Sequence, residues 1–370
     1  TSLANRYIMK TNFNDSVGNR NLTNNNVLLN YSGTASNINY QEATRFQPDL
    51  VWIKARKVAA SHQLFDSIRG VSKVISSEST SAESDLGSYG LTAFNSNGFS
   101  VSDIASGGNG VNGASGGTYS GTPPDYVAWC FNAGSGSSAS NTDGINITST
   151  VKANIPAGFS IVRYTSDGSS SSTVGHGLGS DVRLILQKRL NGVQAPYGIT
   201  DIITGSPQWL QLSSSVAASN ITSNFPMTNS VFGNWEGNGQ DTINYCFADV
   251  AGYQKIGTYN GDGSTSGHYI ETGFEPAFLM IKGASHGGSW AMLDNKRSTT
   301  NPRDEVIYAD SSGAEGGNDV YVKANFLTNG FELKTNDSGI NMSGRSYLYL
   351  AIAADPDTTT PIVENSFGVV

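Results

Sequence analysis

The chain has 370 residues, a net charge of −8 and only 14% charged residues, a balance that argues against a basic, phosphate-binding nucleic-acid protein. Its 37% hydrophobic and 10% aromatic residues supply enough apolar area for folded cores, so the low charge does not indicate disorder. No stretch approaches the ~20 apolar residues of a membrane helix, and no membrane span is predicted. Glycine is frequent, with 43 residues, as is typical of an all-β protein with many turns.

Three copies of one pattern follow an opening segment, residues 1–26, for which we predict an attachment role. Each copy opens on a tyrosine, and a polar residue that ends an apolar strand lies 23 residues later. The tyrosines are Tyr31, Tyr164 and Tyr259, and the polar residues are Lys54, Gln187 and Lys282. A period of about 100 residues predicts a tandem array of one structural unit.

Each copy contains short apolar runs that predict strands. In PDLVWIK (48–54) both alternating faces are apolar, so the strand should be central and covered on both sides. Arg183 breaks this pattern in the second copy and predicts a strand nearer an edge. Asn97-Gly98 and Asn329-Gly330 lie between apolar runs and predict hairpin turns. We count about seven strands per copy and no helical periodicity.

These patterns predict an all-β fold of three tandem antiparallel β-sandwich repeats of about 100 residues, jelly-roll or lectin-like in layout. A Gly/Ser-rich segment reads as a flexible linker between the first two repeats. The predicted boundaries are an N-terminal attachment segment at 1–26, repeat 1 at 27–134, the linker at 135–154, repeat 2 at 155–253, repeat 3 at 254–356 and a C-terminal tail at 357–370.

Two sets of residues are predicted to be structural. Cys130 and Cys246 occupy the same place in two copies, where the third has Ala351, so we expect a small buried core position and no disulfide. The second set repeats an Asp-x-x-Arg pattern, in which we expect each pair to fix a turn through a local ion pair; the alternative is a polar ligand site. The pairs are Asp66 with Arg69 and Asp294 with Arg297, and the second copy keeps only Asp201.

Three motif matches carry little chemistry. Residues 108–113 match GxGxxG and residues 113–117 match GxSxG, but both lack the strand-to-helix context that phosphate binding or a nucleophile requires. Residues 260–271 resemble a calcium loop without its central glycine. The four histidines show no metal-ligand spacing. We therefore predict no catalytic residue, no cofactor and no metal.

Aromatic residues in polar, loop-like stretches are candidate surface contacts for a sugar. They are Tyr119, Tyr197, Trp209 and Trp235, together with His286. Loops at one end of a sandwich commonly carry binding. The alternative for each is packing in a core or between domains, where large aromatics also concentrate.

Long ordered motifs identify a resemblance that spans residues 27–355. PDLVWIKAR, HQLFDSIRGV, LTAFNSNGF, YVAWCFNAGSGSSASNTDGINITSTVKAN, YCFADVAGYQKIGTYNGDGS and TGFEPAFLMIKG together resemble a domain family in virion proteins of tailed bacteriophages, especially marine and cyanobacterial phages. Members of this family are described as structural proteins or tail fibres. The resemblance implies no catalytic residue.

The resemblance implies a non-enzymatic virion component at the particle surface. We expect a tail fibre that presents β-sandwich domains for host adhesion, acts as a homo-oligomer (a trimer as the first expectation), and contacts other virion proteins and a host cell-surface glycan. One alternative is a capsid decoration or capsid-fibre protein. The other is an enzyme that depolymerises glycans, which would place two carboxylates across a cleft.

Overall fold

The computed structural model describes the backbone of residues 21–24, 27–31 and 38–43, and the complete residues 46–102, 111, 125–316, 321–353 and 366–370. These residues form strands, turns and loops and contain no helix, which confirms the predicted all-β class. None of them belongs to a helix that is long and apolar enough to cross a membrane. All strand pairs within the sheets are antiparallel, as expected for sandwich-like units.

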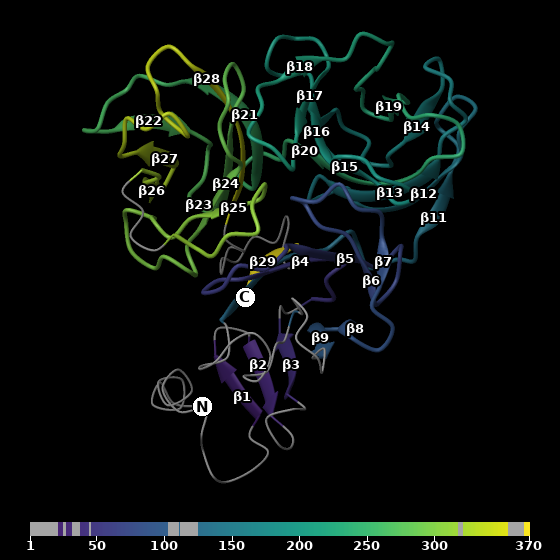
Figure 1. Cartoon of the computed structure of the whole chain (residues 1–370), viewed down its shortest axis with the longest axis horizontal. Helices are drawn as coiled ribbons and strands as arrows, with labels where there is room; N and C mark the ends of the chain where they lie inside the picture. The colour runs from purple at the N-terminus through teal and green to yellow at the C-terminus, as the bar shows by residue number, and fades with distance from the viewer. Residues whose placement is uncertain are drawn as a thin grey trace.

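Unit 1 combines a four-stranded sheet (β29-β10-β4-β5), a five-stranded sheet (β1-β2-β3-β9-β8) and a small β6-β7 ladder (Figure 1). Its strands are β1 (Asn21–Asn24), β2 (Val27–Tyr31), β3 (Ile38–Ala43), β4 (Leu50–Ala55), β5 (Gln63–Asp66), β6 (Lys73–Val74), β7 (Ser84–Asp85), β8 (Gly90–Asn95), β9 (Gly98–Ser102), β10 (Tyr126–Phe131) and β29 (Phe367–Val369). The last described strand of the chain therefore lies in the first unit.

Unit 2 has an eight-stranded sheet, β11-β12-β13-β20-β15-β16-β17-β18, and a two-stranded sheet, β14-β19. Its strands are β11 (Ala139–Asn141), β12 (Ser149–Asn154), β13 (Phe159–Thr165), β14 (Thr173–Gly175), β15 (Val182–Arg189), β16 (Tyr197–Thr200), β17 (Gln208–Gln211), β18 (Ser219–Asn220), β19 (Val231–Gly233) and β20 (Asp241–Ala248).

Unit 3 pairs a five-stranded sheet, β21-β28-β23-β24-β25, with a three-stranded sheet, β22-β27-β26. Its strands are β21 (Gln254–Asn260), β22 (His268–Glu271), β23 (Pro276–Gly283), β24 (Ala291–Asp294), β25 (Ile307–Tyr308), β26 (Ala324–Leu327), β27 (Gly330–Leu333) and β28 (Ser346–Ala353). Figure 1 shows units 2 and 3 side by side above unit 1.

The main sheets of the three units share one register, and three buried lysines mark it. Lys54 faces Val127, Lys188 faces Ile243 and Lys282 faces Leu348 across equivalent strand pairs. The predicted equivalence of Lys54 and Lys282 holds, but that of Gln187 is wrong by one residue. β15 and β23 carry a bulge at the same place, after Val182 and after Pro276, so the bulge does not cause this difference. The extra residue of unit 2 lies earlier, because Val182 follows Tyr164 by 18 residues whereas Pro276 follows Tyr259 by 17.

The observed register corrects two further expectations. Ile185 pairs with Ile199 as Val51 pairs with Phe65 and Leu279 with Leu293, so Thr200, the next residue, takes the place of Asp66 and Asp294 in unit 2 rather than Asp201. β15 is bonded to strands on both sides and is not an edge strand, although Arg183 lies in it. Arg183 falls at the bulge, where a long side chain can leave the covered face of the sheet.

Both predicted hairpins form, with their turns one residue earlier than expected. Gly98 pairs with Asn95 and Gly330 pairs with Leu327, so each glycine opens the second strand of its hairpin. At position 330 a Cβ atom would lie 2.2 Å from the carbonyl oxygen of Ile270, which only glycine avoids.

Two predicted non-globular segments are ordered parts of sheets. The expected linker at 135–154 contains β11 and β12, because Ile147 and Val151 bury their side chains in the core of unit 2. The expected tail at 357–370 contains β29, whose Phe367 is buried. The Gly/Ser-rich composition around β11 and β12 concealed this strand pair. β29 has three residues and is too short to show an alternating pattern.

A single apolar core joins the three units, which corrects the expectation of separate sandwich cores. One face of each main sheet contributes to it, with Trp129 from unit 1, Phe247 from unit 2 and Phe278 from unit 3 among its members. Phe131 lies at its centre, with its ring 5.1 Å from Phe159, 5.8 Å from Phe247 and 4.8 Å from Phe367. Units 1 and 2 keep smaller cores of their own on the opposite faces.

A ring of three backbone hydrogen bonds closes around this shared core. Each donor lies six residues after one of the buried lysines. Ala60 N–H donates to Ser312 C=O at 2.8 Å, Gln194 N–H to Thr80 C=O at 2.9 Å, and Gly288 N–H to Ser215 C=O at 2.7 Å. The bonds run from unit 1 to unit 3, from unit 2 to unit 1 and from unit 3 to unit 2, so each unit is bonded to both others. This equivalence is what tandem copying predicts; the copying itself stays a prediction.

Buried ion pairs strengthen two of the three junctions. Asp66 pairs with Arg69, and its Oδ2 also accepts a hydrogen bond at 2.9 Å from the hydroxyl of Tyr245 in unit 2. Asp294 pairs with Arg297, and its Oδ2 accepts a hydrogen bond at 3.2 Å from Trp129 Nε1 in unit 1. Neither aspartate side chain is exposed, so loss of the donor from the neighbouring unit would remove one hydrogen bond from a buried carboxylate.

Removing the Tyr245 hydroxyl should weaken the junction of units 1 and 2. We expect Tyr245→Phe to lower the free energy of unfolding by about 1–3 kcal/mol, because a buried carboxylate loses a donor. Tyr89→Phe, at a side chain that is 39% exposed, is the control and should change stability by less than ~0.5 kcal/mol. Equal urea midpoints for the two variants would contradict this role of the hydroxyl.

The three buried lysines should make a contribution to the free energy of unfolding that increases with pH. Burial lowers the pKa of Lys54, Lys188 and Lys282 from 10.5 to about 8. Between pH 8 and 10 these three side chains bind more protons in the unfolded chain than in the folded one, so their contribution to the free energy of unfolding should increase, by at least about 1 kcal/mol in total. Urea unfolding at pH 7.5 and 9.5 measures this.

Lys188→Met should reduce the slope of stability against pH over that range, because it removes one of the three groups. Lys57→Met, at an exposed side chain, should leave the slope unchanged. Equal slopes for the parent and Lys188→Met would show that Lys188 is not held in the low-dielectric interior.

Candidate functional site

The structure brings three of the five predicted surface aromatics together. Tyr197 lies on β16, Trp209 on β17 and Trp235 just after β19, and we name these three residues the aromatic cluster. His286 lies apart in unit 3, where its Nε2 is 2.7 Å from the carbonyl oxygen of Ser338. Tyr119 lies outside the described residues, as do the motifs at 108–113 and 113–117, apart from Val111.

The aromatic cluster is built on neighbouring strands. Tyr197 is at the centre, with ring centroids 5.3 Å from Trp209 and 5.1 Å from Trp235, both in edge-to-face contact. Tyr197 and Trp209 project from the same face of the sheet as Ile199, which is fully buried and is the register partner of Trp209. All three aromatics are half-buried against the core of unit 2, so one part of each ring stays accessible.

The fold explains why these rings are not fully covered. The two-stranded sheet β14-β19 is much smaller than the eight-stranded sheet, and β16, β17 and β18 form one end of the larger sheet. On the opposite face Gly198 lies under Trp290 of unit 3, and a Cβ there would be 2.6 Å from Trp290 Cη2. Unit 3 thus supports the strands from behind while their front carries the aromatic cluster.

Polar groups that the sequence analysis missed surround the cluster. Trp235 Nε1 donates to Gln187 Oε1 at 2.5 Å, and Gln187 Nε2 donates to Asn244 Oδ1 at 2.9 Å. Units 1 and 3 carry Ile53 and Ile281 at the position of Gln187. A polar residue at an otherwise apolar strand position was therefore the sequence signal that could have identified Gln187 as part of the site. The one-residue error in the alignment of β15 concealed it.

A buried carboxylate completes this polar rim. Arg189 Nη2 donates to Glu236 Oε2 at 2.5 Å, whereas Glu236 Oε1 has no hydrogen-bond partner among the described residues. The Glu236 side chain is only 2% exposed. Burial raises the pKa of Tyr197, and the Glu236 carboxylate raises it further, so the tyrosine hydroxyl stays protonated at neutral pH.

This arrangement suits recognition of a sugar. Aromatic faces pack against the C–H face of a pyranose ring. Gln187, Asn244 and Glu236 are buried and hold the rings in place from below. Rigid strands fix the rings relative to one another, as a binding platform requires. The Arg189–Glu236 pair adds no net charge, which favours a neutral ligand.

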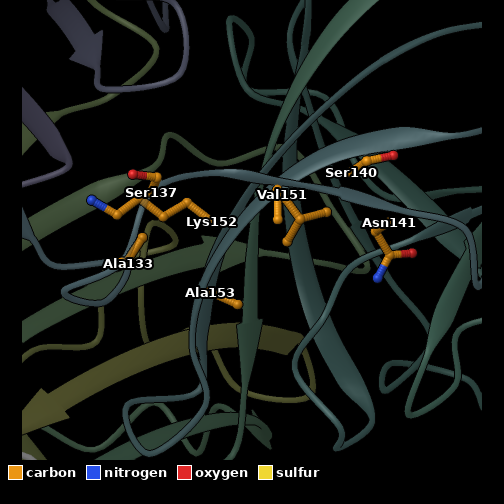
Figure 2. Close-up of a pocket in the computed structure, with 9 residues that line it drawn as sticks. Ala133, Ser137, Ser140, Asn141, Val151, Lys152 and Ala153 are labelled. Atoms are coloured by element: carbon orange, nitrogen blue, oxygen red, sulfur yellow. The ribbon is translucent and has the colours of Figure 1, made fainter.

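A pocket of about 240 Å³ lies on the other side of unit 2, near unit 1. It is lined by Ala133, Gly136, Ser137, Ala139, Ser140, Asn141, Val151, Lys152 and Ala153. Figure 2 shows Ser137 and Lys152 at one end and Ser140 and Asn141 at the other. Lys152 Nζ is 2.6 Å from Asp49 Oδ1, so its charge is neutralised across the junction of the units. We interpret the pocket as a packing gap at that junction.

The remaining residues that the sequence singled out are buried or hydrogen-bonded within their own turns. Cys130 and Cys246 are fully buried, and neither is part of a disulfide. Asp66 and Asp294 each accept hydrogen bonds from backbone amides of their own turn in addition to the ion pairs. In the loop at 260–271, Asp262 Oδ1 already accepts from Ser264 N–H at 2.7 Å, and no His, Cys, Asp and Glu cluster suited to a metal occurs in the described residues.

Taken together, the described residues define an all-β protein whose three units surround one core and carry an aromatic cluster on unit 2. Residues 24–356 match the model of a family described as Domain of unknown function (DUF7483), and the chain belongs to that family. No curated protein and no solved structure shows significant similarity to it.

The half-buried state of the aromatic cluster can be tested through stability. Trp209→Ala should cost less than ~2 kcal/mol, because part of the ring is already in contact with solvent. Trp290→Ala, at a ring that is 1% exposed and supports β16, should cost about 3–5 kcal/mol. Comparable losses for both variants in urea unfolding would show that Trp209 is a core residue and not part of a surface platform.

Proposed function

We propose that the chain is a non-enzymatic structural protein of a bacteriophage particle, a tail-fibre component that binds a glycan on the host surface through the aromatic cluster. The sequence resemblance to tailed-phage virion proteins supports the location. The observation that supports adhesion is the grouping of Tyr197, Trp209 and Trp235 on adjacent strands beside the Arg189–Glu236 pair.

Weak single contacts suffice for such a role. A shallow aromatic platform binds one sugar weakly, but several copies on one particle multiply the affinity by factors of ~10²–10⁴. The shared core supports this proposal because units 2 and 3 hold the platform in one orientation. Homo-oligomerisation and contacts with other virion proteins belong to the same proposal.

Loss of the rings should abolish adhesion without unfolding the chain. The chain, coupled at high density to beads, is presented to an array of bacterial surface polysaccharides. We expect Tyr197→Ala combined with Trp209→Ala to reduce retention at least tenfold, whereas Tyr89→Ala, at an exposed tyrosine of unit 1, leaves it unchanged. Equal retention by the double variant and the parent would exclude the aromatic cluster as the binding site.

Cryo-electron microscopy of the intact particle tests the location. Density for the three-unit body on the tail supports the proposal, and density on the capsid lattice supports a decoration protein instead. Release of reducing sugar from any retained polysaccharide would indicate a depolymerase and overturn the non-enzymatic assignment.

A further inference from the structure

Unit 1 obtains its fourth main-sheet strand from a distant part of the chain. In units 2 and 3 the strand next to β20 and β28 comes from the unit itself and is the strand that contains Tyr164 or Tyr259, β13 or β21. In unit 1 the equivalent place beside β10 is taken by β29, while β2, the first strand of that unit by sequence period, belongs to another sheet. The edge of β10 is therefore an acceptor site for a strand.

β29 fills this acceptor site in the same register as the other units' own strands. Phe367 pairs with Phe131 in unit 1. The equivalent pairs are Phe159 with Phe247 in unit 2 and Gln254 with Ile352 in unit 3. Val369 faces Trp129 at the position of Ile161 and Ile256. The site thus selects a short strand with an apolar residue at alternate positions, and the sequence SFGVV supplies it.

The contacts of β29 are those of an integral strand. Val370 N–H donates to Ala128 C=O at 2.9 Å, and Val370 C=O accepts from Ala128 N–H at 2.6 Å. Ser366 C=O accepts from Asn132 N–H at 2.9 Å. Phe367 is 4% exposed and Val369 is 7% exposed. Asn154 Nδ2 of unit 2 also donates to Ser366 Oγ at 3.1 Å. Each of these contacts has one partner in residues 366–370. The other partner belongs to strands or loops that the rest of the chain forms.

The connection to β29 is much longer than it needs to be. β28 ends at Ala353, and the twelve residues 354–365 separate it from Ser366, a length that can span about 40 Å. Yet the two ends of this connection lie close to the same residue, Phe278. Phe278 is the register partner of Ile352, at the end of β28, and its ring lies 5.6 Å from that of Phe367 in β29. A connection of this length can also reach the acceptor site of a neighbouring copy.

We infer that residues 366–370 are an exchangeable donor strand, and that a second copy of this chain can insert its β29 beside β10. The exchanged and unexchanged forms make the same hydrogen bonds and the same contacts of Phe367 and Val369 in the acceptor site. The balance between them depends on concentration, because the chain's own strand competes at an effective concentration in the millimolar range. Strand exchange links copies without any new surface, and it operates whether or not the aromatic cluster binds sugar.

Disulfide trapping between two single-cysteine chains tests the exchange. Cys130 faces Gly368, a spacing of about 5.5 Å between Cα atoms that a disulfide can bridge. The acceptor chain carries Cys246→Ala and keeps Cys130. The donor chain carries Cys130→Ala, Cys246→Ala and Gly368→Cys. Neither chain can form an internal disulfide, and Cys130 is fully buried, so a mixed disulfide requires the donor's strand in the acceptor's site.

Both chains, each of residues 1–370, are mixed at about 1 mM, where exchange competes with the internal strand, and are then oxidised with glutathione disulfide. We expect a disulfide-linked heterodimer, at least tenfold more abundant than with a donor that also carries Phe367→Asp. The matched reference is a chain with Cys246→Ala and Gly368→Cys, which should close internally and remain a monomer at low concentration.

Each outcome decides the proposal. A heterodimer that depends on Phe367 supports exchange. Internal closure of the reference chain without heterodimer formation shows that β29 stays with its own chain and overturns the proposal. Failure of the reference chain to close would show that β29 does not lie beside β10, which removes the basis of the proposal as well.

Discussion

One face of each unit's main sheet is apolar and can be covered only by the other two units. Trp129, Phe247 and Phe278 meet there, and burial of such large rings is the main favourable contribution to their association. The opposite faces are covered within each unit, with side chains such as Val51 in unit 1 and Ile185 in unit 2. The β-strands are consequently apolar on both sides, and no unit can leave the assembly without exposing half of its main sheet.

Polar groups at the junctions make this association specific. The buried pairs of Asp66 with Arg69 and of Asp294 with Arg297 contribute little net stability by themselves, because desolvation offsets the attraction. They do require a hydroxyl or indole donor from the neighbouring unit. The third junction has Thr200 in place of an aspartate, so the three junctions are distinct and the units cannot exchange places.

Much of the fold follows from local pattern, and the errors have one physical source. The all-β class and both hairpins could be predicted from alternation and turn residues, and so could the local pairs of Asp66 and Asp294. The register of β15, the strands at 139–154 and the position of β29 depend on pairing between residues far apart in the sequence. One extra residue in the connection before β15 changes the alignment of every residue beyond it while leaving composition unchanged.

The residues of the candidate site could likewise be predicted from the sequence, but their arrangement could not. Tyr197, Trp209 and Trp235 could be named from the sequence because aromatic rings in polar stretches are unusual. Their grouping could not, since it arises from the order β15-β16-β17 and from a loop that returns after β19. The Arg189–Glu236 pair spans 47 residues and is visible only in space.

The position of β29 also affects synthesis. During translation, residues 46–131 leave the ribosome more than 200 residues before the strand that completes their sheet. The nascent first unit therefore presents an unpaired edge on β10 and an uncovered Phe131 while units 2 and 3 are made. Chaperones that bind exposed apolar edges would have their longest opportunity there, and the first unit closes only after units 2 and 3 have been made.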